Sequence, residues 1–129
     1  MINNGTVAHW KVEHYIAYLY LAIADADNET TEEEIAMALR KFKKLLDEYY
    51  KDNHLNHSIV LNDVMAEIMN HSDQEKTELV NILSKKFHLD DFLKTDLVSD
   101  LTDIIESDDS VSTSEHYMLS FIRVVLSKN

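Results

Sequence analysis

The sequence predicts an all-α fold in a single domain, and three observations carry this prediction. Apolar residues recur at steps of three and four along most of the chain, which is the period of an amphipathic helix. The chain has no proline and one glycine, whereas β-rich folds and phosphate-binding loops need both residues at tight turns. A length of 129 residues suits one hydrophobic core. We therefore expect one helical bundle over residues 1–129.

About six helices are expected along the chain. The first, at about 7–26, is apolar nearly all round, so we expect it to be the central helix. The later helices are amphipathic, and their expected ranges are about 32–51, 58–70, 73–87, 92–107 and 113–127. Ser72 and Glu75 form a Ser-x-x-Glu pattern, which predicts a capping box at the start of the fourth helix.

The apolar run from Tyr15 to Ala24 belongs to the first helix and is not expected to enter a membrane. A membrane span takes about 20 apolar residues, and this run is shorter. The segment before it lacks the positive excess of a signal peptide, because Glu13 offsets Lys11. The chain has no cysteine, which fits a reducing compartment and excludes disulfides and thiolate sites. We expect a cytoplasmic location.

The charge of the chain limits the partners that it can bind. Twelve Lys and Arg stand against 24 Asp and Glu, which gives a net charge of −12. Such a chain repels phosphate backbones and anionic lipid head groups, so nucleic-acid binding and membrane binding are disfavoured. A cation or a basic protein partner suits it better. The alternative is that the carboxylates only keep a small domain in solution.

Two acidic segments resemble each other at a constant offset of 81 residues. "ADNETTEEEIAM" (26–37) aligns with "SDDSVSTSEHYM" (107–118). This repeat predicts an internal duplication of a helix–acidic loop–helix unit, at about 7–51 and 92–127, with the helical pair 58–87 between the copies. The matched positions are Asp25 with Glu106, Asp27 with Asp108, Thr31 with Ser112, and Glu34 with Glu115.

Helix capping explains only some of these positions. Thr31 and Ser112 are predicted N-caps, and a Glu three residues later reaches back to the amide of the cap. Asp27 and Asp108 follow helix C-termini, where an acid is unfavourable by about 0.3–1 kcal/mol. Either these carboxylates accept hydrogen bonds from turn amides, or they belong to a site for a cation or a partner. Both explanations stay open.

The segments "LAIADADNETTEEE" (21–34) and "LTDIIESDDSVSTSE" (101–115) resemble the acidic helix–loop–helix unit of the TerB-like family, named after tellurite-resistance protein B. The resemblance implies an all-helical domain whose paired acidic motifs form a charged surface that binds metal or contacts other proteins. The residues that correspond to the acidic positions of the family are Asp27, Glu34, Asp108 and Glu115, flanked by Asp25 and Glu106.

The chain departs from the pattern of that family in its loops. Asn28 and Asp109 stand where the family usually has glycine, and Thr30 stands where it has an apolar residue. An EF-hand is excluded, because its sixth and twelfth positions, counted from Asp25, hold Thr30 and Ala36 instead of Gly and Glu. If the two halves pack about a pseudo-twofold axis, their carboxylates supply hard oxygen ligands suited to Ca²⁺, Mg²⁺ or Mn²⁺.

Catalysis is not expected, and we predict no catalytic residue. The chain has no cysteine, no Gly-x-Ser-x-Gly pattern and too little glycine for a phosphate-binding loop. Its seven histidines form no His-Glu-x-x-His pattern, and we expect each to be a surface residue or a hydrogen-bonded one. Trp10, Tyr15, Tyr18 and Tyr20 are expected in the core, the alternative being a self-association face that makes a homodimer.

These observations favour a non-enzymatic, cytosolic TerB-like scaffold. Its expected role in stress or tellurite resistance depends on the family resemblance alone. We expect it to present its paired acidic site to a divalent cation or to a basic protein partner. The alternative is a protein–protein adaptor without metal, in which the acids are helix caps and surface charge.

Overall fold

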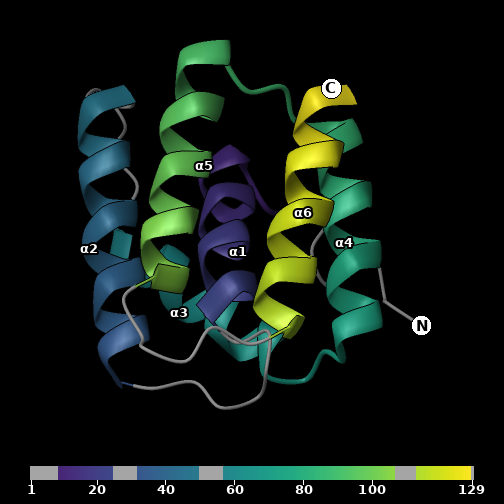
Figure 1. Cartoon of the computed structure of the whole chain (residues 1–129). Helices are drawn as coiled ribbons and strands as arrows, with labels where there is room; N and C mark the ends of the chain where they lie inside the picture. The colour runs from purple at the N-terminus through teal and green to yellow at the C-terminus, as the bar shows by residue number, and fades with distance from the viewer. Residues whose placement is uncertain (1–8, 25–31, 50–56, 107–112, 129) are drawn as a thin grey trace.

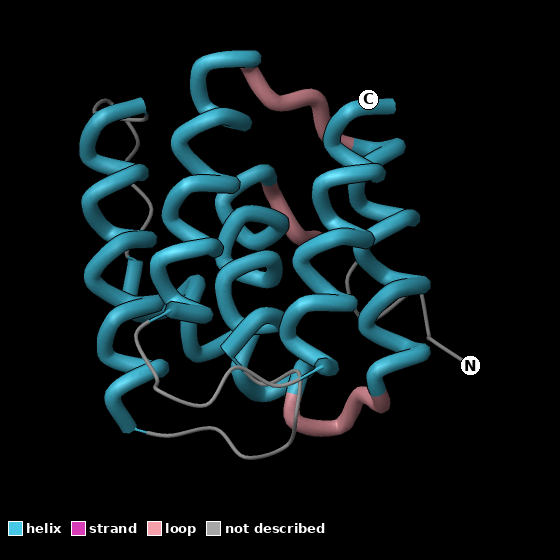
Figure 2. The backbone as a smooth tube through the Cα atoms, in the orientation of Figure 1, coloured by secondary structure: helices cyan, strands magenta, loops and turns pink. Residues whose placement is uncertain are grey.

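The computed structural model describes residues 9–24, 32–49, 57–106 and 113–128, and these residues form six helices with no strand among them (Figure 2). The all-α prediction is therefore confirmed. The helices are α1 (Val12–Ala24), α2 (Glu32–Tyr49), α3 (His57–Ile68), α4 (Asp73–Lys86), α5 (Asp91–Glu106) and α6 (Thr113–Lys128). None of them is long and apolar enough to cross a membrane.

The first helix begins later than the sequence predicts, at Val12 instead of about residue 7, and Trp10 and Lys11 precede it. The side chain of His14 explains the start. Its Nδ1 accepts a hydrogen bond from the backbone N–H of Lys11 at 3.1 Å, while the carbonyl of Lys11 accepts from the backbone N–H of His14. A side chain in the third helical position thus satisfies the amide of the cap, as Glu does in a capping box.

Helix α1 lies at the centre of the bundle and contacts all five other helices (Figure 1). Every residue from Glu13 to Ala24 is buried. A helix that is apolar nearly all round needs neighbours on all sides, and the prediction of a central helix is confirmed.

The aromatic residues near and on α1 belong to the core. Trp10, Tyr15, Tyr18 and Tyr20 are all buried within the bundle. The alternative expectation, that they form a self-association face, is wrong, because the surrounding helices already cover these side chains.

The helix pairs α1–α2 and α5–α6 pack against each other through the contacts α1–α5, α1–α6 and α2–α5. A pseudo-twofold axis that exchanges α1 with α5 and α2 with α6 would turn the α1–α6 contact into the α2–α5 contact. Both contacts are present, as such an arrangement requires. Helices α3 and α4 both contact α1, and α4 also contacts α6. The internal duplication itself stays a prediction.

The direction of the helices matters for the acidic motifs. Helices α1 and α5 run toward the bottom of Figure 1 and end there, while α2 and α6 begin there and run back up. The four helix ends that flank the two acidic segments therefore lie at one end of the bundle. We call this the acidic end and define it by the described positions Ala24, Glu32, Glu106 and Thr113.

Candidate functional site

The acidic end contains the predicted site, and the structure describes part of it. Asp25, Asp27, Thr31, Asp108 and Ser112 lie outside the described residues, as does the side chain of Glu34. Their predicted roles as ligands or helix caps stay predictions. Of the predicted site residues, Glu106 and Glu115 have described side chains.

These two glutamates have opposite surroundings. Glu106, at the end of α5, is exposed, so solvation accounts for its charge. Glu115, in the first turn of α6, has 0% of its surface exposed. Burying a carboxylate is costly unless polar groups compensate it, and the positive end of the helix dipole also favours a carboxylate in this turn. Glu115 is therefore a buried polar residue and not one of the solvated charges of the surface.

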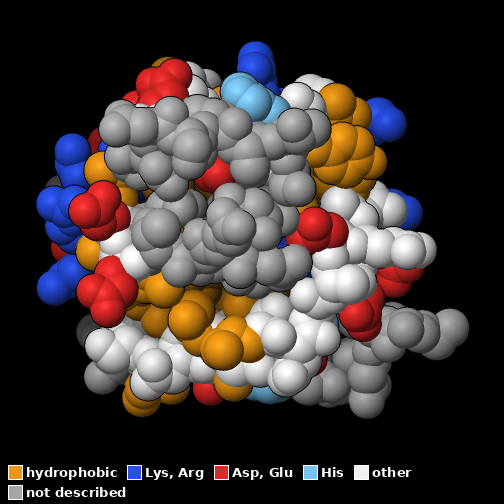
Figure 3. All heavy atoms as spheres, turned by 60° about the horizontal axis from the view of Figure 1, so that its bottom comes forward, with side chains coloured by type: hydrophobic (Ala, Val, Ile, Leu, Met, Phe, Trp, Pro, Cys, Tyr) orange, Lys and Arg blue, Asp and Glu red, His pale blue; other side chains and the backbone are white. Residues whose placement is uncertain are grey.

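Other described acids lie at the same end. Glu32 and Glu33 occupy the first turn of α2, and both are exposed. Figure 3 views the molecule toward this end and shows acidic side chains at several places around it, with hydrophobic side chains between them. The acidic side chains are therefore scattered over the described surface in this view, with Lys and Arg side chains at its edges, and they form no continuous acidic sheet.

The described carboxylates do not by themselves form a metal centre. Within residues 9–24, 32–49, 57–106 and 113–128, no three His, Asp or Glu side chains are grouped so that they could hold a metal ion. A cation site at the acidic end would thus require carboxylates from positions such as Asp27 and Asp108.

A second group of acids lies along α5 and has a structural role that the sequence analysis missed. Asp96 accepts a hydrogen bond from the Tyr49 hydroxyl at 2.5 Å. Asp100 accepts one from the Tyr20 hydroxyl at 2.6 Å. These aspartates join α5 to α2 and to α1.

Lys41 extends this group of contacts between α2 and α5. Its Nζ lies 3.0 Å from Asp103 and 3.6 Å from Asp100. The aspartates stand at positions 96, 100 and 103, and this spacing of four and three was the available signal, because it places them on one helix face.

The tyrosines in these contacts are held in the protonated form. The hydrogen bond to Asp96, with some burial, raises the pKa of Tyr49 to about 12. Burial, and then the hydrogen bond to Asp100, raises the pKa of Tyr20 far above its usual value. Each tyrosine hydroxyl therefore remains a hydrogen-bond donor at neutral pH. This arrangement serves to hold helices together.

His14 is enclosed near the start of α1. Trp10 stacks on its ring, with centroids 5.6 Å apart and an interplanar angle of 14°. Since Nδ1 accepts from Lys11, the ring hydrogen is on Nε2, which faces the carboxylate of Asp63 on α3 at 3.5 Å. Burial lowers the pKa of His14, and the hydrogen bond and the charge of Asp63 oppose this effect.

His71 joins α1 to the turn between α3 and α4. Its Nδ1 lies 2.8 Å from the Tyr18 hydroxyl, and its Nε2 lies 3.5 Å from Glu67. His14 and His71 are therefore hydrogen-bonded residues, as expected. His116 is exposed on α6.

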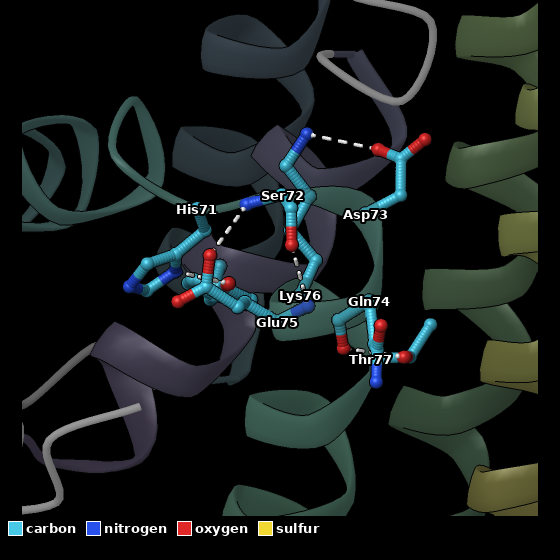
Figure 4. Close-up of polar contacts among 8 residues, drawn as sticks. His71, Ser72, Asp73, Gln74, Glu75, Lys76 and Thr77 are labelled. Carbon is cyan, nitrogen blue, oxygen red and sulfur yellow. Dashed lines mark hydrogen bonds and ion pairs between the residues drawn. The ribbon is translucent and has the colours of Figure 1, made fainter. Parts of the chain in front are cut away.

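The capping box of α4 follows directly after His71 (Figure 4). The backbone N–H of Glu75 donates to the Ser72 hydroxyl at 3.2 Å, and the backbone N–H of Ser72 donates to the Glu75 carboxylate at 3.0 Å. These backbone and side-chain hydrogen bonds with Ser72 lower the pKa of Glu75. The predicted capping box is confirmed.

No protein-family model, curated protein or solved structure matches this chain. The resemblance to the TerB-like family thus depends on the two acidic motifs and stays a prediction.

Proposed function

We propose that this protein is a non-enzymatic TerB-like scaffold of the cytoplasm, which presents its paired acidic motifs to a divalent cation or to a basic protein partner. A role in stress or tellurite resistance is proposed from the resemblance alone. The motif residues are Asp25, Asp27, Glu34, Glu106, Asp108 and Glu115.

One observation supports this proposal most: the helix ends that flank both acidic motifs lie at the same end of the bundle (Figure 1). The contacts of α1 with α5 and α6 hold the two helix pairs together. Carboxylates from two copies of one motif can therefore act on one ligand. Open clusters of carboxylate oxygens favour hard divalent cations with weak affinity.

Thermal unfolding in the presence of cations tests the proposal. At a Ca²⁺, Mg²⁺ or Mn²⁺ concentration roughly ten times Kd, binding to the folded state adds about 1.4 kcal/mol to the free energy of unfolding and raises Tm by a few degrees. The double variant Asp27→Asn with Asp108→Asn should lose this rise.

A matched control removes two charges elsewhere. Asp47 and Glu48 are exposed in the last turn of α2, away from the acidic end, so Asp47→Asn with Glu48→Gln should keep the cation-induced rise. An equal response in both double variants would contradict a specific site. If no cation changes Tm, a lysine-rich peptide that binds the wild type and not Asp27→Asn/Asp108→Asn would still support the basic-partner form.

The adaptor without metal is the second candidate, and exposed apolar residues on α6 favour it. Tyr117 is 67% exposed and Val124 is 50% exposed, and their spacing of seven places them on one face of the helix. In an adaptor, Tyr117→Ser with Val124→Ser would abolish binding of a purified partner, while Asp27→Asn/Asp108→Asn would leave it unchanged.

A further inference from the structure

Helix α2 carries a concentration of positive charge in an otherwise acidic protein. Arg40, Lys41, Lys43 and Lys44 are four of the 12 Lys and Arg in the chain and fall within five residues. The remaining eight stand against 24 acids. Lys and Arg side chains gather at the left edge of Figure 3, the side on which α2 lies in Figure 1.

Three of these cations line a shallow hollow on one face of α2. The hollow has a volume of about 220 Å³ and is lined by Met37, Arg40, Lys41 and Lys44. The spacing of these residues is i, i+3, i+4 and i+7, which is one stripe of a helix. We call these four residues, together with the adjacent Lys43, the basic face.

Most of the positive charge on this face is not neutralised by described residues. Lys41 is held by Asp100 and Asp103 of α5, which also fixes its position. Arg40, Lys43 and Lys44 are exposed, and none forms an ion pair with a residue that the structure describes.

The basic face is short, and acids lie beyond it along the helix. A stripe from i to i+7 spans about 10 Å, close to the screening length of about 8 Å at physiological salt. Asp47 and Glu48 follow in the next turn. A ligand with a few adjacent negative charges is attracted here, whereas a long polyanion such as nucleic acid also meets the net charge of −12.

We propose that the basic face docks a short acidic segment of a partner protein, with carboxylates against Arg40 and Lys44 and an apolar side chain over Met37. Charge complementarity supports the carboxylates, and the thioether at the hollow supports the apolar contact. This surface is separate from the acidic end, because it lies in the middle of α2 and attracts ligands of the opposite charge.

Fluorescence anisotropy with a defined probe tests the proposal. The probe is a short fluorescein-labelled peptide in which glutamates flank one leucine, and the same peptide with glutamine in place of glutamate is its control. We expect the glutamate peptide to bind more weakly as salt is raised and the glutamine peptide not to bind. The double variant Arg40→Gln with Lys44→Gln should weaken binding about tenfold.

The matched control is Lys85→Gln with Lys128→Gln, which removes two exposed cations from α4 and α6. It should change the affinity by less than about twofold, since these charges lie on other helices. Circular dichroism checks that both double variants remain helical. Equal loss of binding in the two variants would overturn the proposal, because net charge alone would then explain it.

Two other outcomes would also overturn it. One is a short DNA duplex that binds the basic face more tightly than the peptide at the same salt. The other is self-association of the chain in sedimentation experiments that disappears in Arg40→Gln/Lys44→Gln, which would make a second copy the occupant. Neither outcome depends on cation binding at Asp27 and Asp108. The peptide-binding experiment therefore tests the basic face even if the proposed cation site at the acidic end is wrong.

Discussion

Three tyrosines of α1 are buried alike, yet their hydroxyl groups have different partners. Tyr20 donates to the carboxylate of Asp100 and Tyr18 lies within hydrogen-bond distance of His71. Among the residues that the structure describes, the hydroxyl of Tyr15 has no hydrogen-bond partner. Its ring stacks on Phe87, with centroids 6.1 Å apart. The three side chains are thus equally buried, but their hydroxyl groups differ in hydrogen bonding.

Replacing each tyrosine by phenylalanine should produce three different effects on the free energy of unfolding, measured in urea. Tyr20→Phe should cost about 1.5–3 kcal/mol, because it removes a hydrogen bond to a charged group. Tyr18→Phe should cost about 0.5–1.5 kcal/mol, which is the range of a typical intramolecular hydrogen bond. Tyr15→Phe should be neutral or slightly stabilising, because it removes a buried hydroxyl without a described partner. Equal losses in the three variants would contradict these assignments.

At the scale of elements, the contact between α1 and α3 includes a titratable pair. His14 is buried and faces Asp63 across this contact. Burial lowers the pKa of His14 below 6.5 in the folded protein, so the unfolded chain binds a proton more readily. The contribution of the neutral ring to stability is therefore complete above pH 6.5 and declines as the pH falls toward the folded pKa.

We expect the free energy of unfolding of the wild type to fall on acidification through this window, and to fall less in His14→Gln. NMR titration should show the His14 resonance, identified by its absence in that variant, changing below pH 6.5. Asp63→Asn removes a charge that favours the protonated ring, so it should lower the pKa of His14 further. Asp91→Asn, at a carboxylate 99% exposed on α5, should leave the titration unchanged.

At the scale of the whole molecule, α1 connects the bundle, because every other helix packs against it. No outer helix can lose its contact with α1 without exposing apolar surface of the core. Local damage to α1 should therefore weaken the entire fold. We expect the domain to unfold in one cooperative transition.

Leu19→Ala on α1 tests this expectation, since Leu19 is fully buried. It should lower the free energy of unfolding by about 2–5 kcal/mol and keep a single transition by circular dichroism and by tryptophan fluorescence. Met69→Ala should change stability by less than about 0.5 kcal/mol, because this side chain is 74% exposed. Two separate transitions in Leu19→Ala would show that α1 does not unite the bundle.

The helices and the central position of α1 could be predicted from the amino-acid sequence, because both depend on local patterns. The apolar period marks each helix, the Ser72–Glu75 pattern marks the start of α4, and a helix without a polar side must be enclosed. The start of α1 was missed, because a histidine takes the role that a capping box usually gives to Glu or Gln.

The candidate site shows where local pattern is insufficient. Glu106 and Glu115 belong to the same predicted acidic set, yet one is exposed and the other is buried. No role was predicted for the aspartates of α5, yet Asp100 joins α5 to Tyr20 of α1 and Lys41 of α2. Such differences depend on the rotation of each helix about its axis and on the choice of its neighbours. Contacts between distant parts of the chain set both, and no local spacing of residues encodes them.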